Sequence, residues 1–297
     1  MGQLRIVIET PEPVRLRDYL RRRTGVSARL LTQLKQSPEG ILCNGVPWRT
    51  VDLVRAGDVV VLTMPEGRGL EPNPALRVPA VLETAHYIVY DKPTGMPVHP
   101  SAKHRRDTLG NYFAACMPTH TFRAVNRLDR DTSGLCMIAK DAYTAGALQG
   151  KLDKRYYAVL CGRLTRDGTI SAPIARAEAS IITRCVREDG QPAVTHYRVL
   201  GCSPDYTAVE IRLETGRTHQ IRVHFAHLGY PLAGDDLYGG SCRDIDRQAL
   251  HCGRLYWRDP VTGQPCSAVS PWRREMQQLV PQVQLDWRNL NEEDCEF

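Results

Sequence analysis

Charged side chains crowd into one short stretch of this sequence, immediately before an apolar run. Residues 126–134 read Asn-Arg-Leu-Asp-Arg-Asp-Thr-Ser-Gly and place two carboxylates and two guanidinium groups within five residues. Residues 135–139, Leu-Cys-Met-Ile-Ala, are typical of a buried strand. A carboxylate beside a protein core must be paired or chemically useful, so Asp129 and Asp131 belong either to an ion-paired turn or to a reactive site. Turns are rich in Asp, Thr, Ser and Gly in any protein, and the stretch alone favours neither interpretation.

Histidines and arginines gather in a second stretch, residues 215–224, which reads Thr-Gly-Arg-Thr-His-Gln-Ile-Arg-Val-His. Thr218 is a typical N-cap residue, so we expect a helix that begins there and ends at Gly229. His224 and His227 are spaced to share one face of that helix. A zinc site in a protein needs three or four ligands, and no third ligand is evident, so no metal is expected.

The elements that must position these two stretches are mostly strands. Apolar segments that alternate or run continuously predict strands, whereas helical patterns are few and do not alternate with them. We therefore expect an α+β fold with a mixed, mainly antiparallel sheet. Strands are expected at 86–90, 135–139, 156–161, 195–200 and 208–213, and helices at 108–115 and 141–152.

The composition is that of an ordinary globular protein. The chain has 297 residues, of which 42% are hydrophobic and 24% charged. No apolar run approaches the roughly 20 residues of a membrane span, and the N-terminus lacks the apolar region of a secretory signal. The ten cysteines form no Cys-x-x-Cys pair and are scattered through apolar runs. We expect reduced, buried thiols and a cytoplasmic location.

Positive charge is concentrated at the N-terminal end of the chain. Residues 1–64 hold ten Lys or Arg and six Asp or Glu, which gives +4 of the total net charge of +6. Such asymmetry raises the expectation of a polyanionic partner, although a basic helix face is more often simply solvated. Residues 65–80 hold four prolines and predict a linker, so we expect domains at 1–64 and 81–285 and an acidic tail at 286–297.

The N-terminal domain is expected to combine two short basic helices with strands. A strand is predicted at 4–9, one helix at 14–23 that stops at Gly25, and a second helix capped by Ser27. Asn44 and Gly45 predict a hairpin turn. The pattern over residues 13–63 resembles an S4-type RNA-binding module; the alternative is a small α+β cap without a ligand. The resemblance implies contacts to RNA phosphates from Arg15, Arg17, Arg21, Arg22, Arg29 and Lys35.

Five ordered motifs in the remainder of the chain resemble those of the RluA-type pseudouridine synthases. They are YDKPTGMPVHP at 90–100, RLDRDTSGLCMIAKD at 127–141, KRYYAVLCG at 154–162, LETGRTHQIRVHFAHLGYPLAGDDLYGG at 213–240 and LHCGRLYWRDPVTGQ at 250–264. This resemblance implies an enzyme that isomerises uridine in RNA to pseudouridine and needs no cofactor or metal ion. It also implies a monomer that does not associate with a membrane. Large-subunit ribosomal RNA is the expected substrate and transfer RNA the alternative.

The resemblance also implies roles for single residues. Asp129 is expected to be the catalytic carboxylate, as nucleophile or proton acceptor, with Arg222 as its bidentate cationic partner. Tyr156 is expected to stack on the target base, and Arg127 to enter the RNA stack when the uridine is flipped out. Arg217 and His219 are expected to contact RNA.

One position departs from the family pattern, and one pair of residues needs a choice. Asn126 occupies the place of the family's usual His and could alter how the loop of Asp129 is held. Tyr156 and Tyr157 are adjacent in a predicted strand, so their side chains point to opposite faces. The spacing of the Lys-x-Tyr motif selects Tyr156 for the pocket.

Two other functions compete with this interpretation. Residues 129–132, Asp-Arg-Asp-Thr, loosely fit the nucleophile loop of haloacid-dehalogenase-type phosphatases, but the preceding apolar strand and the βα alternation of that fold are missing. The other is a catalytically silent RNA-binding factor in ribosome assembly. The acid, tyrosine and arginine expected of an active synthase are all present, which argues against it.

Overall fold

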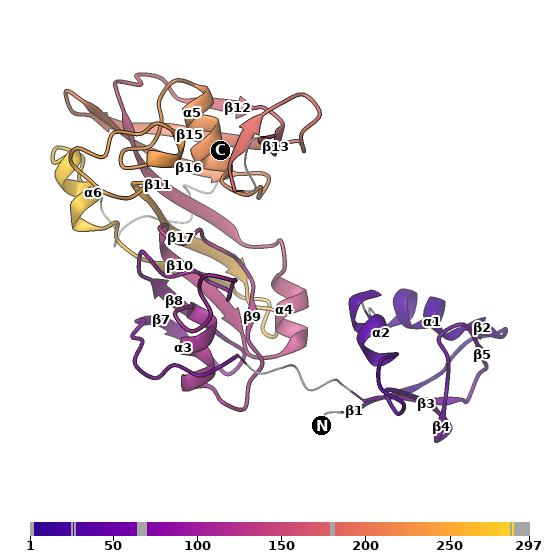
Figure 1. Ribbon diagram of the computed structural model, residues 1–297. Coiled ribbons are helices and arrows are strands. Elements are labelled where there is room, and N and C mark those ends of the chain that lie inside the picture. The colour runs from indigo at the N-terminus through magenta and orange to yellow at the C-terminus, as the bar shows by residue number, and fades with distance from the viewer. Residues whose placement is uncertain are drawn as a thin grey trace. The chain divides into compact units, whose positions relative to one another are not determined.

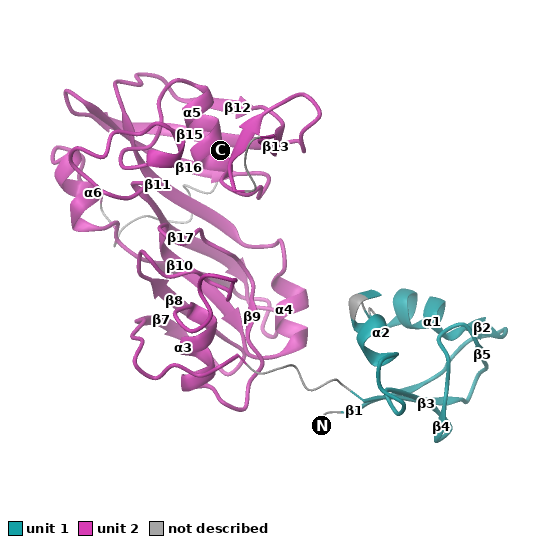
Figure 2. Cartoon of the chain, viewed as in Figure 1, with its two compact units in different colours: residues 1–69 teal, residues 70–297 magenta. Residues whose placement is uncertain are grey.

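The chain folds into two units, residues 1–69 and 70–297 (Figure 2), and each is described by itself. The computed structural model describes residues 3–24, 26, 28–63, 70–178, 182–285 and 287, without the side chain of Arg29. The predictions for Gly25 and Ser27, most of the acidic tail and the first part of the linker lie outside these residues. Residues 70–79 contain no helix or strand.

The first unit is a small antiparallel sheet with two short helices (Figure 1). Apolar side chains of both helices, among them Leu16, Leu20 and Leu31, pack with those of the sheet in one core. The four-stranded sheet has the order β1 (Gln3–Val7), β6 (Val59–Thr63), β3 (Ile41–Cys43), β4 (Val46–Pro47), and β2 (Val14–Arg15) pairs with β5 (Leu53–Val54). The helices are α1 (Leu16–Arg23) and α2 (Ala28–Leu34).

The predicted hairpin turn between β3 and β4 is confirmed. Asn44 and Gly45 have φ values of 51° and 83°, which are the positive φ angles that a type I′ turn requires at both central residues. The Asn44 side chain donates to Asp58 at 2.9 Å and accepts from the backbone N–H of Val59 at 2.8 Å. The turn is therefore tied to β6 by side-chain bonds as well as by the backbone ladder.

The second unit is built on one ten-stranded sheet, which confirms the predicted α+β class with mainly antiparallel strands. All ladders are antiparallel except β10 with β17, which run parallel where Ser133 faces His251 and Gly134 faces Cys252. The sheet order is β12 (Gly168–Ser171), β15 (Val194–Cys202), β16 (Tyr206–Leu213), β11 (Asp153–Cys161), β17 (Leu250–Arg258), β10 (Ser133–Ala139), β8 (Tyr87–Lys92), β7 (Ala80–Glu83), with β18 (Pro265–Val269) on β17 and β9 (Arg123–Ala124) on β10.

The remaining elements of this unit are short helices and one hairpin. The hairpin consists of β13 (Ile174–Arg176) and β14 (Arg184–Val186), and it contacts α5. The helices are α3 (Leu109–Cys116), α4 (Ala142–Leu148), α5 (Gln220–His227), α6 (Arg274–Leu279) and the 3-10 turn η1 (Asp236–Tyr238).

Two predicted helix boundaries are wrong for local backbone reasons. The helix expected to reach residue 152 ends as α4 at Leu148, just before Gly150, which has a φ of 75°. The helix expected to start with Thr218 as its cap starts at Gln220, because His219 takes the N-cap position in the left-handed conformation (φ 57°, ψ 19°) and makes no side-chain cap bond. A non-glycine residue in this conformation is uncommon.

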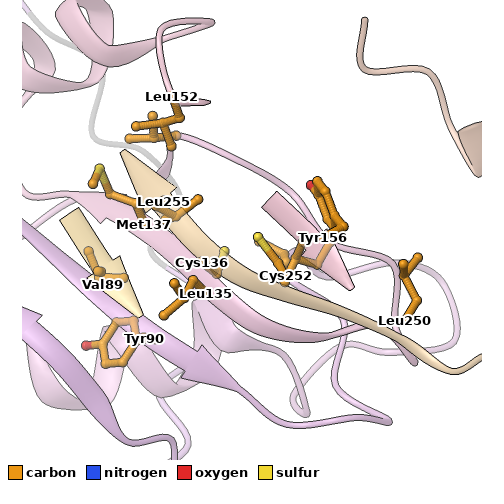
Figure 3. Close-up of a cluster of buried hydrophobic side chains, with 14 of the residues drawn as sticks. Val89, Tyr90, Leu135, Cys136, Met137, Leu152, Tyr156, Leu250, Cys252 and Leu255 are labelled. Atoms are coloured by element: carbon orange, nitrogen blue, oxygen red, sulfur yellow. The ribbon is translucent and has the colours of Figure 1, made fainter. Parts of the chain in front are cut away.

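Strand β10 lies at the centre of the core, and all seven of its residues are buried. Figure 3 shows side chains of this cluster, including Cys136 of β10, Cys252 of β17 and Tyr156 of β11. Tyr157 packs on the other face of the sheet, with its ring centroid 4.8 Å from that of Trp287. The prediction that the two tyrosines point to opposite faces is confirmed.

The described cysteines are free, as expected, but most of them are not buried. The nine cysteines in the described part of the chain are all free, as predicted, but only three of them are buried. Cys116 and Cys242 are exposed, and the other four are half-buried. No helix in the described ranges is long and apolar enough to cross a membrane.

Gly134 marks the point at which the charged loop enters the core, and its replacement should be costly. It has a φ of 106°, and a Cβ atom there would lie 2.2 Å from the carbonyl oxygen of Cys252. We expect Gly134→Ala to lower the free energy of unfolding by more than about 2 kcal/mol, measured by urea denaturation. Gly146→Ala is the matched control.

The control separates backbone strain from the generic effect of adding a methyl group. Gly146 lies in α4 with no atom within 4 Å of an added Cβ, so its replacement by alanine should stabilise the chain by about 0.5–1 kcal/mol. Equal effects of the two substitutions would contradict the proposed contact between β10 and β17.

Candidate active site

Asp129 lies in a small pocket of the second unit, with a volume of about 70 Å³. The loop before β10 supplies Asp129, strand β11 supplies Tyr156, and the start of α5 supplies His219 and Arg222. The structure therefore gathers the three predicted catalytic residues. The lining residues are Arg127, Leu128, Asp129, Thr132, Tyr156, Leu213, Arg217, His219, Gln220, Ile221, Arg222 and Leu250.

Arg222 is the nearest cation to Asp129, but it is not its bidentate partner. Its Nη1 atom lies 3.5 Å from Oδ2 of Asp129. The bidentate bond is made instead to Asp235, whose two oxygens accept from Nε and Nη2 at 2.7 Å each. The predicted bidentate pairing with Asp129 is wrong, because the fully buried Asp235 carboxylate occupies two of the arginine's nitrogens and leaves the third for the pocket.

The electrostatics of Arg222 follow from this arrangement. Burial opposes its charge, but the hydrogen bonds to Asp235 and the charges of Asp235 and Asp129 outweigh it, so that the pKa of Arg222 is raised. The guanidinium also lies 5.0 Å from the ring centroid of Tyr238, at cation–π distance. Arg222 is therefore a fixed positive charge at the wall of the pocket.

His219 is the second polar neighbour of Asp129. Its Nε2 atom lies 3.8 Å from Oδ2 of Asp129, and its Nδ1 atom lies 2.8 Å from the hydroxyl of Tyr238. Burial lowers the pKa of His219, and the attraction of Asp129 offsets this only in part. Burial therefore favours the neutral form of this imidazole.

Tyr156 provides the aromatic wall of the pocket. Its side chain is buried, and burial raises its pKa well above the usual value, with smaller contributions from Cys252 and Asp129. The phenol therefore stays protonated beside the carboxylate. In the ladder it faces Cys252 of β17 and Ile211 of β16, which fixes its position in the centre of the sheet.

The two arginines predicted to meet RNA beside the pocket both line it. Arg127 is exposed. Arg217 is half-buried, and its Nε atom donates to the carbonyl of Pro192 at 3.0 Å. Arg127 is thus open to a large ligand, whereas Arg217 is tethered to the neighbouring loop.

A buried lysine holds the loop that carries Asp129. Lys92 is fully buried and donates to the carbonyls of Pro93 and Met96 at 2.8 Å and of Arg130 at 3.0 Å. Burial lowers its pKa to about 8, yet at neutral pH the ammonium group remains charged and has three protons for three acceptors. Lys92 therefore joins the loop after β8 to the loop of Asp129.

Asn126 holds the other end of the same loop. Its amide nitrogen donates to the carbonyl of Leu135 at 3.1 Å, and its amide oxygen accepts from the N–H of Met137 at 2.8 Å. Both partners belong to the backbone of β10. The residue that departs from the family pattern therefore extends the β9–β10 ladder with its side chain.

Gln220 anchors the loop that precedes α5. Its side-chain oxygen accepts from the N–H of Arg217 and the hydroxyl of Thr215, both at 2.9 Å, and its nitrogen donates to the carbonyl of Val194 at 3.0 Å. These bonds tie the loop to β15. They take the place of the cap that was predicted at Thr218.

The basic residues predicted to bind RNA in the first unit lie at its surface. Arg21 and Arg22 are exposed in the last turn of α1, and Arg15 is exposed just before it. Arg17 is half-exposed and lies 3.2 Å from Asp18. Lys35 is exposed after α2, and the side chain of Arg29 lies outside the described part of the chain.

Four residues of the site were not predicted from the sequence: Lys92, Gln220, Asp235 and Tyr238. Each lies within a motif that carries the family resemblance, which is the only signal that could have found them. Their partners are set by packing between segments far apart in the chain. Within the described residues, no group of three or more His, Cys, Asp or Glu side chains could hold a metal ion.

Known proteins resemble this chain in sequence. The model of the family described as RNA pseudouridylate synthase matches residues 86–227. An uncharacterized RNA pseudouridine synthase of Bacillus subtilis, YjbO, is 38% identical over 268 residues, which cover 86% of this chain and 95% of that protein. The ribosomal large subunit pseudouridine synthase D of Xanthomonas campestris is 38% identical over 269 residues, covering 82% of this chain and 81% of the relative.

A solved structure also resembles this chain. The human protein RNA Pseudouridylate Synthase Domain Containing 1 superimposes with a TM-score of 0.55 and 27% sequence identity. The superposition covers 68% of this chain and 86% of the human chain.

Loss of the Asp235 charge should destabilise the fold. Asp235→Asn leaves the buried Arg222 guanidinium without its main counter-charge, and removing one partner of a buried pair typically costs about 3–5 kcal/mol. The free energy of unfolding from urea denaturation measures this. Asp205→Asn is the control, since Asp205 pairs with Arg243 at the exposed surface and should cost at most about 1 kcal/mol. Similar losses in both variants would contradict the role of the buried pair.

Proposed function

The chain belongs to the RNA pseudouridylate synthase family and is an RNA pseudouridine synthase, and from this we propose that it modifies uridines of large-subunit ribosomal RNA. The relative from Xanthomonas campestris, named for the large ribosomal subunit, supports this substrate over transfer RNA, the second candidate. A ribosomal RNA substrate and the free cysteines both fit the cytoplasmic location expected from the sequence.

The observation that carries the proposal is the placement of Asp129 in the pocket, between Arg222 and His219 and near Tyr156. Isomerisation breaks the bond between ribose C1′ and uracil N1 and forms a bond from C1′ to C5. The proton of C5 is released and N1 takes up a proton, so that the product is an isomer of the substrate. Asp129 is the proposed catalytic carboxylate. As a nucleophile it would bond to the ribose or uracil, and as a base it would take a ribose proton. Both roles need an ionised carboxylate, and the guanidinium of Arg222 lies 3.5 Å from it.

The proposed roles of the other residues follow from their positions. Tyr156 presents an aromatic wall on which the flipped uracil can stack. Arg127 is exposed and lines the pocket, so its planar cation can fill the gap that the flipped base leaves in the RNA. Flipping costs a few kcal/mol, and a stacked guanidinium offsets part of this.

The first unit is the proposed docking module for RNA outside the pocket. Arg21 and Arg22 are exposed in the last turn of α1, next to Arg23. Arg17 and Arg29 belong to α1 and α2, and Arg15 and Lys35 directly flank these helices. Phosphate contacts of this kind give affinity without sequence specificity, so the pocket and its surroundings select the uridine.

Asp129→Asn should abolish pseudouridine formation and leave RNA affinity within a few fold, because the amide keeps the shape of the side chain but loses its charge. Turnover is measured as tritium released from C5 of labelled uridine in unmodified large-subunit ribosomal RNA, with transfer RNA transcripts tested in parallel. A variant that still releases tritium would disprove the role of Asp129. Tritium release from transfer RNA alone would identify transfer RNA, the second candidate, as the substrate.

The matched control for this substitution lies two residues further along the same loop. Asp131 pairs with Arg130, an exposed side chain, at 2.8 Å, and it does not line the pocket. Asp131→Asn should therefore keep turnover within about threefold of the wild type, because exposed pairs contribute little.

Removal of two charges from α1 should weaken RNA binding and its dependence on salt. The double variant Arg21→Ala with Arg22→Ala removes two exposed cations. The slope of log affinity against log salt should fall by about 1.5, at roughly 0.7–0.9 per lost phosphate contact. Arg49→Ala is the control, since Arg49 is already paired with Asp52. An unchanged slope in the double variant would exclude α1 from the RNA interface.

A further inference from the structure

One short segment, residues 235–238, supplies the partners of both polar neighbours of Asp129. Asp235 binds Arg222, and Tyr238 binds His219. We propose that Tyr238 fixes His219 as a neutral hydrogen-bond donor to Asp129, with the imidazole proton on Nε2. His219 and Tyr238 are then positioning residues for the reaction. The inference deepens the proposed function, because it takes Asp129 as the catalytic carboxylate.

The backbone at His219 places this side chain in the pocket. His219 has a φ of 57° and ψ of 19°, directly before α5, a conformation that residues other than glycine rarely adopt. Such strain persists where the surrounding structure requires it, often at functional sites. The His219 side chain is only 12% exposed and faces Asp129 rather than solvent. It is therefore poorly placed for the RNA contact predicted from the sequence.

The hydrogen bonds of Tyr238 select the imidazole tautomer. The hydroxyl oxygen of Tyr238 accepts from the backbone N–H of Arg184 at 2.9 Å, and the same oxygen lies 2.8 Å from Nδ1 of His219. A tyrosine hydroxyl has one proton to donate. With the N–H of Arg184 as its donor, the hydroxyl gives that proton to Nδ1. A neutral imidazole with Nδ1 as acceptor carries its own proton on Nε2, the atom that faces Asp129.

Burial is the largest influence on His219 and lowers its pKa, which favours the neutral imidazole. Asp129 and Asp235 favour the imidazolium, whereas burial and the cations Arg222 and Arg184 oppose it. A neutral donor orients the carboxylate without cancelling its charge. Nη1 of Arg222 and Nε2 of His219 lie 3.5 Å and 3.8 Å from Oδ2 of Asp129. Such distances in a ligand-free site commonly shorten once substrate fills the pocket.

The tautomer can be tested directly on the full-length protein, without any RNA. Nitrogen-15 NMR of histidine-labelled protein distinguishes protonated from unprotonated ring nitrogens, and comparison with His219→Asn identifies the signals of His219. We expect a protonated Nε2 and an unprotonated Nδ1 at pH 7 in the wild type. Tyr238→Phe should give a mixture of tautomers. A proton on Nδ1 in the wild type, or an imidazolium, would overturn the proposal even if Asp129 is the catalytic residue.

Kinetics test whether Tyr238 acts through His219. Tyr238→Phe keeps the ring beside Arg222 and removes only the hydroxyl, so kcat on unmodified large-subunit ribosomal RNA should fall roughly tenfold, with KM changed less than about twofold. His219→Asn tolerates the left-handed backbone but lacks a donor at the Nε2 position. It should lower kcat by on the order of 100-fold.

The double variant, Tyr238→Phe with His219→Asn, shows whether Tyr238 acts through His219 or independently of it. Because Tyr238 acts only through His219, the double variant should be no slower than His219→Asn alone. Losses that multiply would overturn the proposal. Tyr87→Phe is the control: it removes a buried tyrosine hydroxyl bonded to Asp259 at 2.9 Å, outside the pocket, and should leave kcat and KM unchanged. Thermal unfolding of each variant separates loss of fold from loss of rate.

Discussion

The buried ion pair between Arg222 and Asp235 is the constraint on which the site depends. A guanidinium in the interior must be paired, and here both oxygens of one fully buried carboxylate bind two of its nitrogens. The pair joins α5 to the segment before η1, thirteen residues further along the chain. Since those two bonds fix the plane of the guanidinium, its remaining nitrogen can only face Asp129. Asp129, the proposed catalytic carboxylate, thus has an oriented cation 3.5 Å away.

The sheet positions the charged loop of Asp129 at the edge of the apolar core. Strands β10 and β17 run parallel over two residue pairs, and the absence of a side chain at Gly134 lets the strands meet. The buried Lys92 ammonium donates to three backbone carbonyls, those of Pro93, Met96 and Arg130, the last of which belongs to the loop of Asp129. The apolar cluster below (Figure 3) can therefore be continuous up to Tyr156, directly beside the charged residues.

The sequence predicted the strands, the α+β class and the gathering of Asp129, Tyr156 and Arg222, because apolar periodicity and ordered motifs report on these features directly. It did not predict which carboxylate binds Arg222 through both oxygens. That choice depends on how the segment after α5 folds back, and no local pattern encodes it. The start of α5 was also missed, since Thr218 has the chemistry of a cap whereas His219, with its left-handed backbone, takes the N-cap position one residue later.

Asn126 acts on the backbone of its loop rather than on the charges around Asp129. The family's usual residue there is a histidine, and in this chain an amide bonds to two backbone groups of β10. A side-chain amide has an N–H donor next to a C=O acceptor, as the backbone of a strand residue does. The side chain of Asn126 therefore continues the hydrogen bonds of the β9–β10 ladder beyond the end of β9. None of its bonds reach Asp129, Arg222 or His219. The position therefore sets how the loop is held, while the charges next to Asp129 come from α5 and from residues 235–238.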